Sequence, residues 1–252
     1  MVFDNSVVDD VTAYLDDWLV SKIAGFDIGA PHMPFLSRII RNERDVASYS
    51  KVHSISTVFG QSIYEQISVI IANSNSDDAE HQRDIPIEIS QARRDLITQI
   101  IDDLNAGNRE PNRQAEMEQI LATPNEDVHC VIPKPKKYDV FIRRGDDEYF
   151  FDLKTVKPNI SDFAKFKEQM LQWIAREDHI VHTMMIFPYN PYLPEPFETA
   201  YQIGNMVSPN EYMVGEQYWD FIGGAGAYQQ VLDIFDQVGA AHWNELNEII
   251  NG

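Results

Sequence analysis

The sequence has only one cysteine, Cys130, among its 252 residues, so no disulfide can form within the chain. A lone cysteine suits a reducing compartment, and here we interpret it as a small filler rather than a reactive thiol. Long apolar runs are missing too, and no segment approaches the ~20 apolar residues that cross a bilayer. The first ten residues lack the basic and apolar regions of a signal peptide. We therefore expect a cytoplasmic protein with no part in the membrane.

Basic residues are scarce: 20 Lys and Arg stand against 40 Asp and Glu, which gives a net charge of -20 and a pI of about 4.5. A chain of this charge repels a polyanion as a whole, which argues against a nucleic-acid partner. Residues 130–170 are the exception, because they hold nine Lys and Arg against seven Asp and Glu. The positive charge is thus concentrated in one region. The seven histidines show no spacing typical of a zinc site.

The most informative pattern lies in that same region. Two apolar and aromatic stretches, 138–142 and 148–156, flank a charged turn at 143–147, which predicts a β-hairpin. Side chains two apart on a strand share a face, so Asp152 and Lys154 should project together, and the hairpin can place Asp139 beside Asp152. Two carboxylates in one place repel each other unless a hard cation such as Mg²⁺ neutralises them. A lysine beside that metal can orient or deprotonate water, so the pattern indicates metal-assisted phosphodiester hydrolysis. Charged residues on a solvated hairpin are the alternative interpretation of the same pattern.

The elements around the hairpin favour the catalytic interpretation. We expect an amphipathic helix within 1–25, a largely buried helix over 59–72, a helix over 90–104, a helix that begins at Ser161 or Asp162, and a buried strand over 183–188. The polar stretch 73–84 predicts an exposed loop. The proline-rich segment 188–198 predicts a rigid loop, and Trp219 with its neighbours predicts core or a dimer interface.

Helix, hairpin, helix and strand in this order resemble the core of the PD-(D/E)xK nucleases. The chain is similar to type II restriction endonucleases, and in particular it resembles the group named after a Treponema denticola enzyme, whose members cut GGNCC. The matching stretches are 60–66, 137–142, 151–159, 187–192 and 214–224. This resemblance implies an α/β fold with a central mixed sheet flanked by helices and with helical additions at both ends. It also implies a single nuclease domain over 1–252, with a catalytic core at about 55–190 and a family-specific region at about 191–252.

The resemblance also implies roles for individual residues. Asp139 and Asp152 would be metal ligands, Lys154 the catalytic lysine, and Glu65 an acidic residue that reaches the metal. The cofactor would be Mg²⁺, with Mn²⁺ as a substitute. Tyr138 stands where the family pattern has proline. Expected DNA contacts are Lys137, Arg143, Arg144, Lys157, Asn159, Lys165, Tyr189 and Asn190. The basic surface that offsets the acidic charge would also include Lys134, Lys136 and Lys167.

We therefore expect a type II restriction endonuclease that makes Mg²⁺-dependent double-strand cuts at a short palindromic site. A homodimer follows because two sites related by a two-fold axis match a palindrome. A cognate methyltransferase would be encoded nearby without being a stable partner. Two alternatives stay open: another nuclease of the superfamily with a role in repair or resolution of DNA junctions, and a catalytically silent acidic DNA mimic. Mg²⁺-dependent cutting of plasmid DNA separates them.

Overall fold

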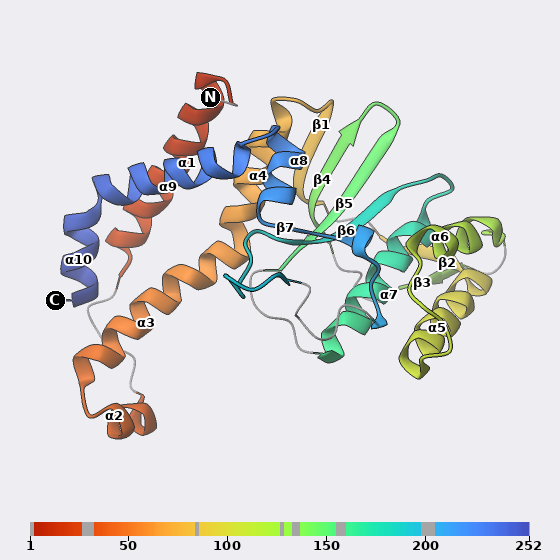
Figure 1. Cartoon of the computed structure of the whole chain (residues 1–252), viewed down its shortest axis with the longest axis horizontal. Helices are drawn as coiled ribbons and strands as arrows, with labels where there is room; N and C mark the ends of the chain where they lie inside the picture. Colours follow the sequence, from red (N-terminus) through yellow and green to blue (C-terminus); the bar gives the residue numbers. More distant parts are fainter. Residues whose placement is uncertain are drawn as a thin grey trace.

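The computed structural model describes residues 3–26, 33–83, 86–126, 129–132, 137–154, 160–197 and 205–251. Its centre is a five-stranded sheet in the order β1-β4-β5-β6-β7 (Figure 1). The strands are β1 (Asp78–Arg83), β4 (Tyr138–Arg144), β5 (Asp147–Leu153), β6 (His182–Phe187) and β7 (Tyr212–Val214). The β1–β4 and β4–β5 pairs are antiparallel, whereas β5–β6 and β6–β7 are parallel. The expected α/β fold with a mixed sheet is confirmed.

The predicted hairpin is present and is tighter than expected. Strands β4 and β5 are joined by only Gly145 and Asp146, and Gly145 has a φ of +60°. A two-residue hairpin turn needs positive φ, which glycine adopts without steric strain. The backbone N–H of Gly145 also donates to the Asp77 carboxylate over 2.6 Å. Residues assigned to the turn, such as Arg143 and Arg144, therefore belong to the strand.

Helices cover both faces of the sheet. One face presents Val140, Ile142 and Phe151 to α4 (Tyr64–Asn73) and α8 (Glu216–Gly223), and α1 (Asn5–Ala24) and α9 (Ala227–Ala241) pack against these two helices. The other face presents Phe141 and Phe150 to the core around α7 (Ile160–Arg176), and α5 (Gln91–Ala106) and α6 (Arg113–Ala122) pack against α7. Alternation along β4 and β5 thus divides the apolar residues between two cores, as strand geometry requires. The small sheet of β2 (Glu88–Ser90) and β3 (His129–Val131) lies beside α5.

The predicted helices are confirmed. Helix α1 buries Val7, Val11, Leu15 and Leu19, spaced four apart on one face. The helix expected over 59–72 consists of a π-helical turn η1 (Phe59–Ile63) followed by α4, and α5 and α7 begin at residues 91 and 160. None of the described helices is long and apolar enough to cross a membrane.

The loop expected over 73–84 is wrong for its second half, which forms the edge strand β1. Its sequence is almost entirely polar because an edge strand with one face toward solvent needs few apolar side chains. Among residues 78–82, whose side chains the structure describes, only Ala79 is buried, and it lies opposite Ile142 of β4. Backbone pairing with β4, rather than an apolar pattern, places this strand.

An arm projects from this body (Figure 1). It consists of α2 (Pro34–Ile40) and α3 (Glu43–Val58), and α3 runs through η1 into α4 without a break. At about 1.5 Å per residue, the 16 residues of α3 span about 24 Å. The helix α10 (Trp243–Asn251) packs against α3 near the C-terminus.

Candidate active site

Asp139 and Asp152 come together through the strand register. Val140 pairs with Phe151, and continuing this antiparallel register places Asp139 opposite Asp152. The Asp139 carboxylate accepts a hydrogen bond from the backbone N–H of Leu153 over 2.7 Å, directly beside Asp152. Asp152 is only 1% exposed. The backbone of β5 therefore fixes the position of the first carboxylate relative to the second.

Lys154 completes the group. Its Nζ lies 2.5 Å from Oδ2 of Asp152, and its side chain is 14% exposed. The same Nζ lies 4.2 Å from the ring centroid of Phe166 in α7, close enough for a cation–π contact. The backbone N–H of Lys154 donates to the carbonyl of Ile186 over 2.7 Å. The ammonium is thus held at the end of β5 by a carboxylate, an aromatic ring and its own backbone.

Glu65 lies in α4 and is buried, and its Oε2 accepts a hydrogen bond from Gln82 over 3.0 Å. The charges of Glu65 and of Asp139 in the hairpin both influence Tyr218 of α8. Burial raises the pKa of Tyr218 most, the side-chain contact with Ser68 lowers it, and the charges of Asp139 and Glu65 raise it further. Both carboxylates therefore act on the same buried phenol. Apart from its place in a matching stretch, no pattern in the sequence pointed to Tyr218.

The chemistry of these donors suits a hard divalent cation. Asp139, Asp152 and Glu65 offer only oxygen atoms, which Mg²⁺ prefers. Among the residues that the structure describes, however, no three His, Cys, Asp or Glu side chains are grouped closely enough to hold a metal ion. The hairpin therefore supplies two carboxylates in one place, and the expected contribution of Glu65 to a metal site stays a prediction.

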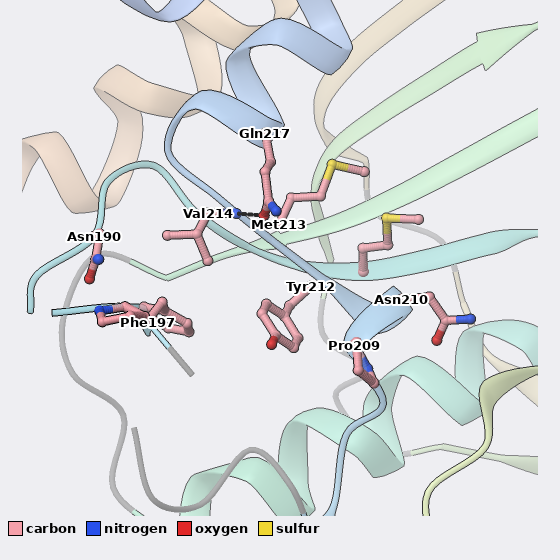
Figure 2. A pocket seen from close by; sticks show the side chains of 10 residues that line it. Asn190, Phe197, Pro209, Asn210, Tyr212, Met213, Val214 and Gln217 are labelled. Carbon is pink, nitrogen blue, oxygen red and sulfur yellow. Dashed lines mark hydrogen bonds between the residues drawn. The ribbon is translucent and has the colours of Figure 1, made fainter. Parts of the chain in front are cut away.

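The ends of three parallel strands meet beside this group. Strand β6 ends next to Lys154, and the backbone N–H of Gly215, which follows β7, donates to the carbonyl of Phe187 over 2.8 Å. A pocket of about 600 Å³ lies between β7 and the loop after β6, and Asp139, Asp152 and Lys154 are not part of its lining (Figure 2). Its lining includes Asn190, Phe197, Asn210, Tyr212 and Gln217. Of these residues, only Asn190 was predicted to contact DNA.

Gln217 has a defined orientation in this pocket. Its Oε1 accepts a hydrogen bond from the backbone N–H of Val214 over 3.2 Å, shown as a dashed line in Figure 2. Because a backbone N–H can only donate, the oxygen of the amide must face the strand. The –NH₂ group of Gln217 is then the polar atom that remains for a ligand.

The expected DNA contacts occupy different surroundings. Lys137 is exposed at the start of β4, and the Lys165 side chain is 73% exposed on α7. Tyr189 is partly exposed, with its ring centroid 6.5 Å from that of Tyr64. Asn190 uses its amide to hold the loop, because it donates to Glu195 and accepts from the N–H of Tyr192. Lys134, Lys136, Lys157 and Asn159 lie outside the described residues.

Arg143 and Arg144 lie at the turn end of the hairpin, away from Asp139. Four residues along a strand correspond to about 13 Å. The guanidinium of Arg144 donates to the Ser76 hydroxyl, the Asn75 side chain and the carbonyls of Phe221 and Ile222. These contacts tie the hairpin turn to the end of α8. A DNA contact by either arginine would thus lie far from the carboxylates, and Arg144 has a structural role.

The inclusion of Lys167 in a basic surface is wrong. Its side chain is 0% exposed, and its Nζ lies 2.5 Å from a carboxylate oxygen of Glu116 and 2.5 Å from one of Glu211. Glu211 also accepts hydrogen bonds from the N–H and hydroxyl of Ser208. A charged side chain can be buried only when it is paired, and this one joins α7 to α6 and to the short helix η4 (Pro209–Glu211).

The sequence of the chain is similar to those of known type II restriction enzymes. The chain is 25% identical over 215 residues to the type II restriction enzyme MjaII of Methanocaldococcus jannaschii, a match that spans 79% of this chain and 57% of that enzyme. It is 26% identical over 208 residues to HgiEI and 24% identical over 206 residues to HgiCII, two type II restriction enzymes of Herpetosiphon aurantiacus. Each match spans 77% of this chain and 73% of the relative. No solved structure matches significantly.

The expected similarity to type II restriction endonucleases is confirmed, but the family that matches is the HinfI family and not the Treponema group named from the sequence. It is described as "Type II restriction endonuclease, HinfI", and it matches residues 4–239, almost the whole chain. The match includes both strands of the hairpin, α4, α7 and the pocket at β7. The chain belongs to the HinfI family of type II restriction endonucleases.

Proposed function

We propose that this chain is a site-specific deoxyribonuclease that makes Mg²⁺-dependent double-strand cuts at a short palindromic DNA site, as part of a restriction–modification system. The family membership supports the class of reaction. The observation that carries the proposal is the arrangement at the end of the hairpin opposite its turn. There, one backbone hydrogen bond and one ion pair fix Asp139, Asp152 and Lys154. The match with MjaII spans just over half the length of that enzyme.

The residues at this end of the hairpin have separate roles in the proposed reaction. Asp139 and Asp152 would hold a divalent cation, which when bound lowers the pKa of a coordinated water and stabilises charge on the phosphate. Lys154 has a fixed ammonium at 2.5 Å from Asp152, so it can hydrogen-bond the attacking water or a phosphate oxygen. Its ring contact with Phe166 limits hydration of the ammonium and strengthens that interaction. Glu65, on the neighbouring helix, would reach the metal through water.

The DNA would approach the end of the sheet where β5, β6 and β7 finish. Strands in a sheet are about 4.8 Å apart, so the pocket at β7 lies about 10 Å from β5. DNA base pairs are stacked about 3.4 Å apart, so this separation covers a few base pairs. The –NH₂ group of Gln217 can donate to acceptors on a base edge, with guanine O6 and N7 as suitable partners. GGNCC, the site implied by the resemblance, is therefore the first sequence to test.

Phosphate contacts would come from Lys137 and Lys165, with Lys157 and Asn159 from the part outside the described residues. Because Lys167 is buried and Arg144 is occupied, the basic surface is smaller than the sequence suggested. The net charge of -20 remains. Neutralisation of Asp139 and Asp152 by metal should therefore contribute strongly to DNA binding as well as to catalysis.

A homodimer is part of this proposal. Asp139, Asp152 and Lys154 form one group in each chain, and cleavage of both strands of a palindrome is simplest with two such groups related by a two-fold axis. A cognate methyltransferase would protect the host DNA without binding this chain stably.

The test is cleavage of supercoiled plasmid and of DNA of known sequence with Mg²⁺, with Ca²⁺ and with EDTA. Wild-type protein should give discrete fragments with Mg²⁺ only, whereas Asp152→Asn should bind DNA with Ca²⁺ and not cut. Asp146→Asn, at the exposed hairpin turn, is the matched control and should cut normally. A smear would favour a nonspecific nuclease of the same superfamily. Absence of cutting with every metal, together with competition against DNA-binding proteins, would favour the acidic DNA mimic.

A further inference from the structure

The α2–α3 arm (residues 33–58) presents apolar side chains to solvent. Phe35 is 84% exposed and Ile39 is 78% exposed, and the two are four residues apart, so they lie on the same face of α2. Ile40, Tyr49 and Val52 are also exposed. Soluble monomers seldom expose a contiguous group of large apolar residues, and such a group marks an interaction site.

The arm also contains an apolar groove. Leu36, Ile40, Val46 and Tyr49 line it with Asp45, and its volume is about 350 Å³. The arm is anchored to the body through α3. Ser48 donates to the carbonyl of Ile250 over 2.6 Å, and Lys51 donates to the carbonyl of Ile249. Lys22 of α1 donates to Ser54 over 2.8 Å. The arm is thus held by its base while its tip presents the apolar residues.

The charge of the arm differs from that of the rest of the chain. It carries four basic residues against two acidic ones, in a protein of net charge -20. The basic residues are Arg38, Arg41, Arg44 and Lys51. A surface that combines apolar side chains with positive charge fits an acidic partner that also exposes apolar side chains.

Such a surface is present on the same protein. Helices α9 and α10 (residues 227–251) carry Asp233, Asp236, Glu245 and Glu248, all exposed, and no Lys or Arg. Leu232 of α9 and Trp243 at the start of α10 are exposed as well. The arm and the α9–α10 surface are therefore complementary both in charge and in apolar character.

We propose that the arm is the dimerisation element, and that the arm of each copy docks on the α9–α10 surface of a second copy. This proposal rests on the proposed function, which requires two active sites on one palindrome. The two reciprocal contacts form a closed, isologous dimer. Helices α2 and α3 contribute 7 and 16 residues, and a standard protein interface uses roughly 20 to 30 residues a side.

A DNA-binding arm is the competing interpretation, and the positions of the side chains argue against it. The most exposed residues at the tip, Phe35 and Ile39, are apolar, whereas phosphate contacts need Lys or Arg. An acidic and partly apolar surface on a second copy matches both the exposed apolar side chains and the net positive charge of the arm.

Sedimentation equilibrium without DNA tests the proposal. Wild-type protein should sediment at twice the 29.0 kDa mass of one chain. Phe35→Ser combined with Ile39→Ser should give monomers, because each fully buried large apolar side chain contributes roughly ten- to a hundredfold to an equilibrium constant. With two such side chains in each of the two contacts, the dissociation constant should rise at least about ten-thousandfold. Val131→Ser with Ile180→Ser, which removes exposed apolar residues elsewhere, is the matched control and should stay dimeric.

A charge exchange identifies the docking surface. Arg38→Glu with Arg41→Glu should weaken self-association, and so should Asp233→Lys with Asp236→Lys in a separate protein. An equimolar mixture should form a heterodimer, because both of its arm contacts then pair opposite charges. Failure of the mixture to associate would show that the arm docks elsewhere and overturn this assignment.

Wild-type protein that stays monomeric, or an arm variant that stays dimeric, would also overturn the proposal. So would an arm variant that loses DNA binding while the wild type is monomeric, since the arm would then contact DNA. The measurement requires no cleavage. A protein that dimerises through the arm but never cuts DNA would therefore contradict the proposed function alone.

Discussion

Replacing Lys167 with methionine should destabilise the protein by about 3–5 kcal/mol, because one partner of a buried ion group is removed while the carboxylates remain. Lys167 is 0% exposed, and its partners Glu116 and Glu211 are 0% and 2% exposed, so water cannot replace the lost ammonium. For a chain of this size, 1 kcal/mol corresponds to about 2–4 °C in Tm, so Tm should fall by roughly 6–20 °C. Lys165→Met, two residues away and largely exposed, should change stability by less than about 0.5 kcal/mol.

The measurement is thermal and urea denaturation followed by circular dichroism at pH 7 and pH 5. In the Lys167→Met protein the two buried carboxylates repel each other, so the folded state raises the pKa of one of them above its unfolded value. The folded state then binds more protons than the unfolded state, and the stability deficit should shrink as pH falls. Adding Glu116→Gln and Glu211→Gln should recover most of the loss, since an apolar or neutral replacement of a whole buried ion group is nearly neutral. A single variant within about 1 kcal/mol of wild type at pH 7 would refute the reasoning.

Three other predictions concern the site and the surface. Lys154→Met should lower the cleavage rate by orders of magnitude while Mg²⁺ dependence survives, and Lys154→Arg should not restore it because a planar guanidinium is a poor point charge; near-normal cutting with only a change in Tm would mean a structural lysine. Gln217→Glu keeps an acceptor for the N–H of Val214 but loses the –NH₂ donor, so it should preserve Tm and weaken specific DNA binding by roughly 10- to 100-fold. DNA binding is measured by titration in the presence of Ca²⁺. Unchanged binding would show that Gln217 does not contact the DNA. Hydrogen bonds to Asp16 and then Glu245 raise the pKa of His242 above 6.5, so its contribution to stability is complete below pH 6.5 and is lost as pH rises through the raised folded value. The Tm deficit of His242→Asn should therefore be larger at pH 6 than at pH 8.5, and an equal deficit at both would contradict the charged contact.

The sequence predicted those parts of the fold that depend on local patterns. The hairpin combines two apolar strands with a glycine turn, and α1 repeats its apolar residues every four positions, so both were found. Strand β1 was missed because its pairing with β4 is formed by backbone groups that carry no sequence signal. The arm was missed for a related reason, since its exposed apolar residues obscure the usual division between a buried and a solvated face.

For the candidate site too, the sequence predicted only what local patterns determine. Asp139, Asp152 and Lys154 were found because strand periodicity brings them together within 16 residues of sequence. Lys167 was misread because its partners Glu116 and Glu211 are 51 and 44 positions away, so no local pattern distinguishes it from an exposed lysine. Tyr218 and Gln217 lie near the site only because β7 docks beside β6. Contacts of that range depend on the packed sheet rather than on the residues next to each other.

The hydrogen bond from the Leu153 N–H to Asp139 has a consequence for the newly made protein. If β5 slipped by one residue against β4, Asp152 and Lys154 would turn to the opposite face of the sheet, and Asp139 would lose its backbone donor. Under the proposed function, the group of Asp139, Asp152 and Lys154 would form only in the correctly paired sheet. Incomplete folding products and degradation fragments would then be unable to cut the chromosome of the host.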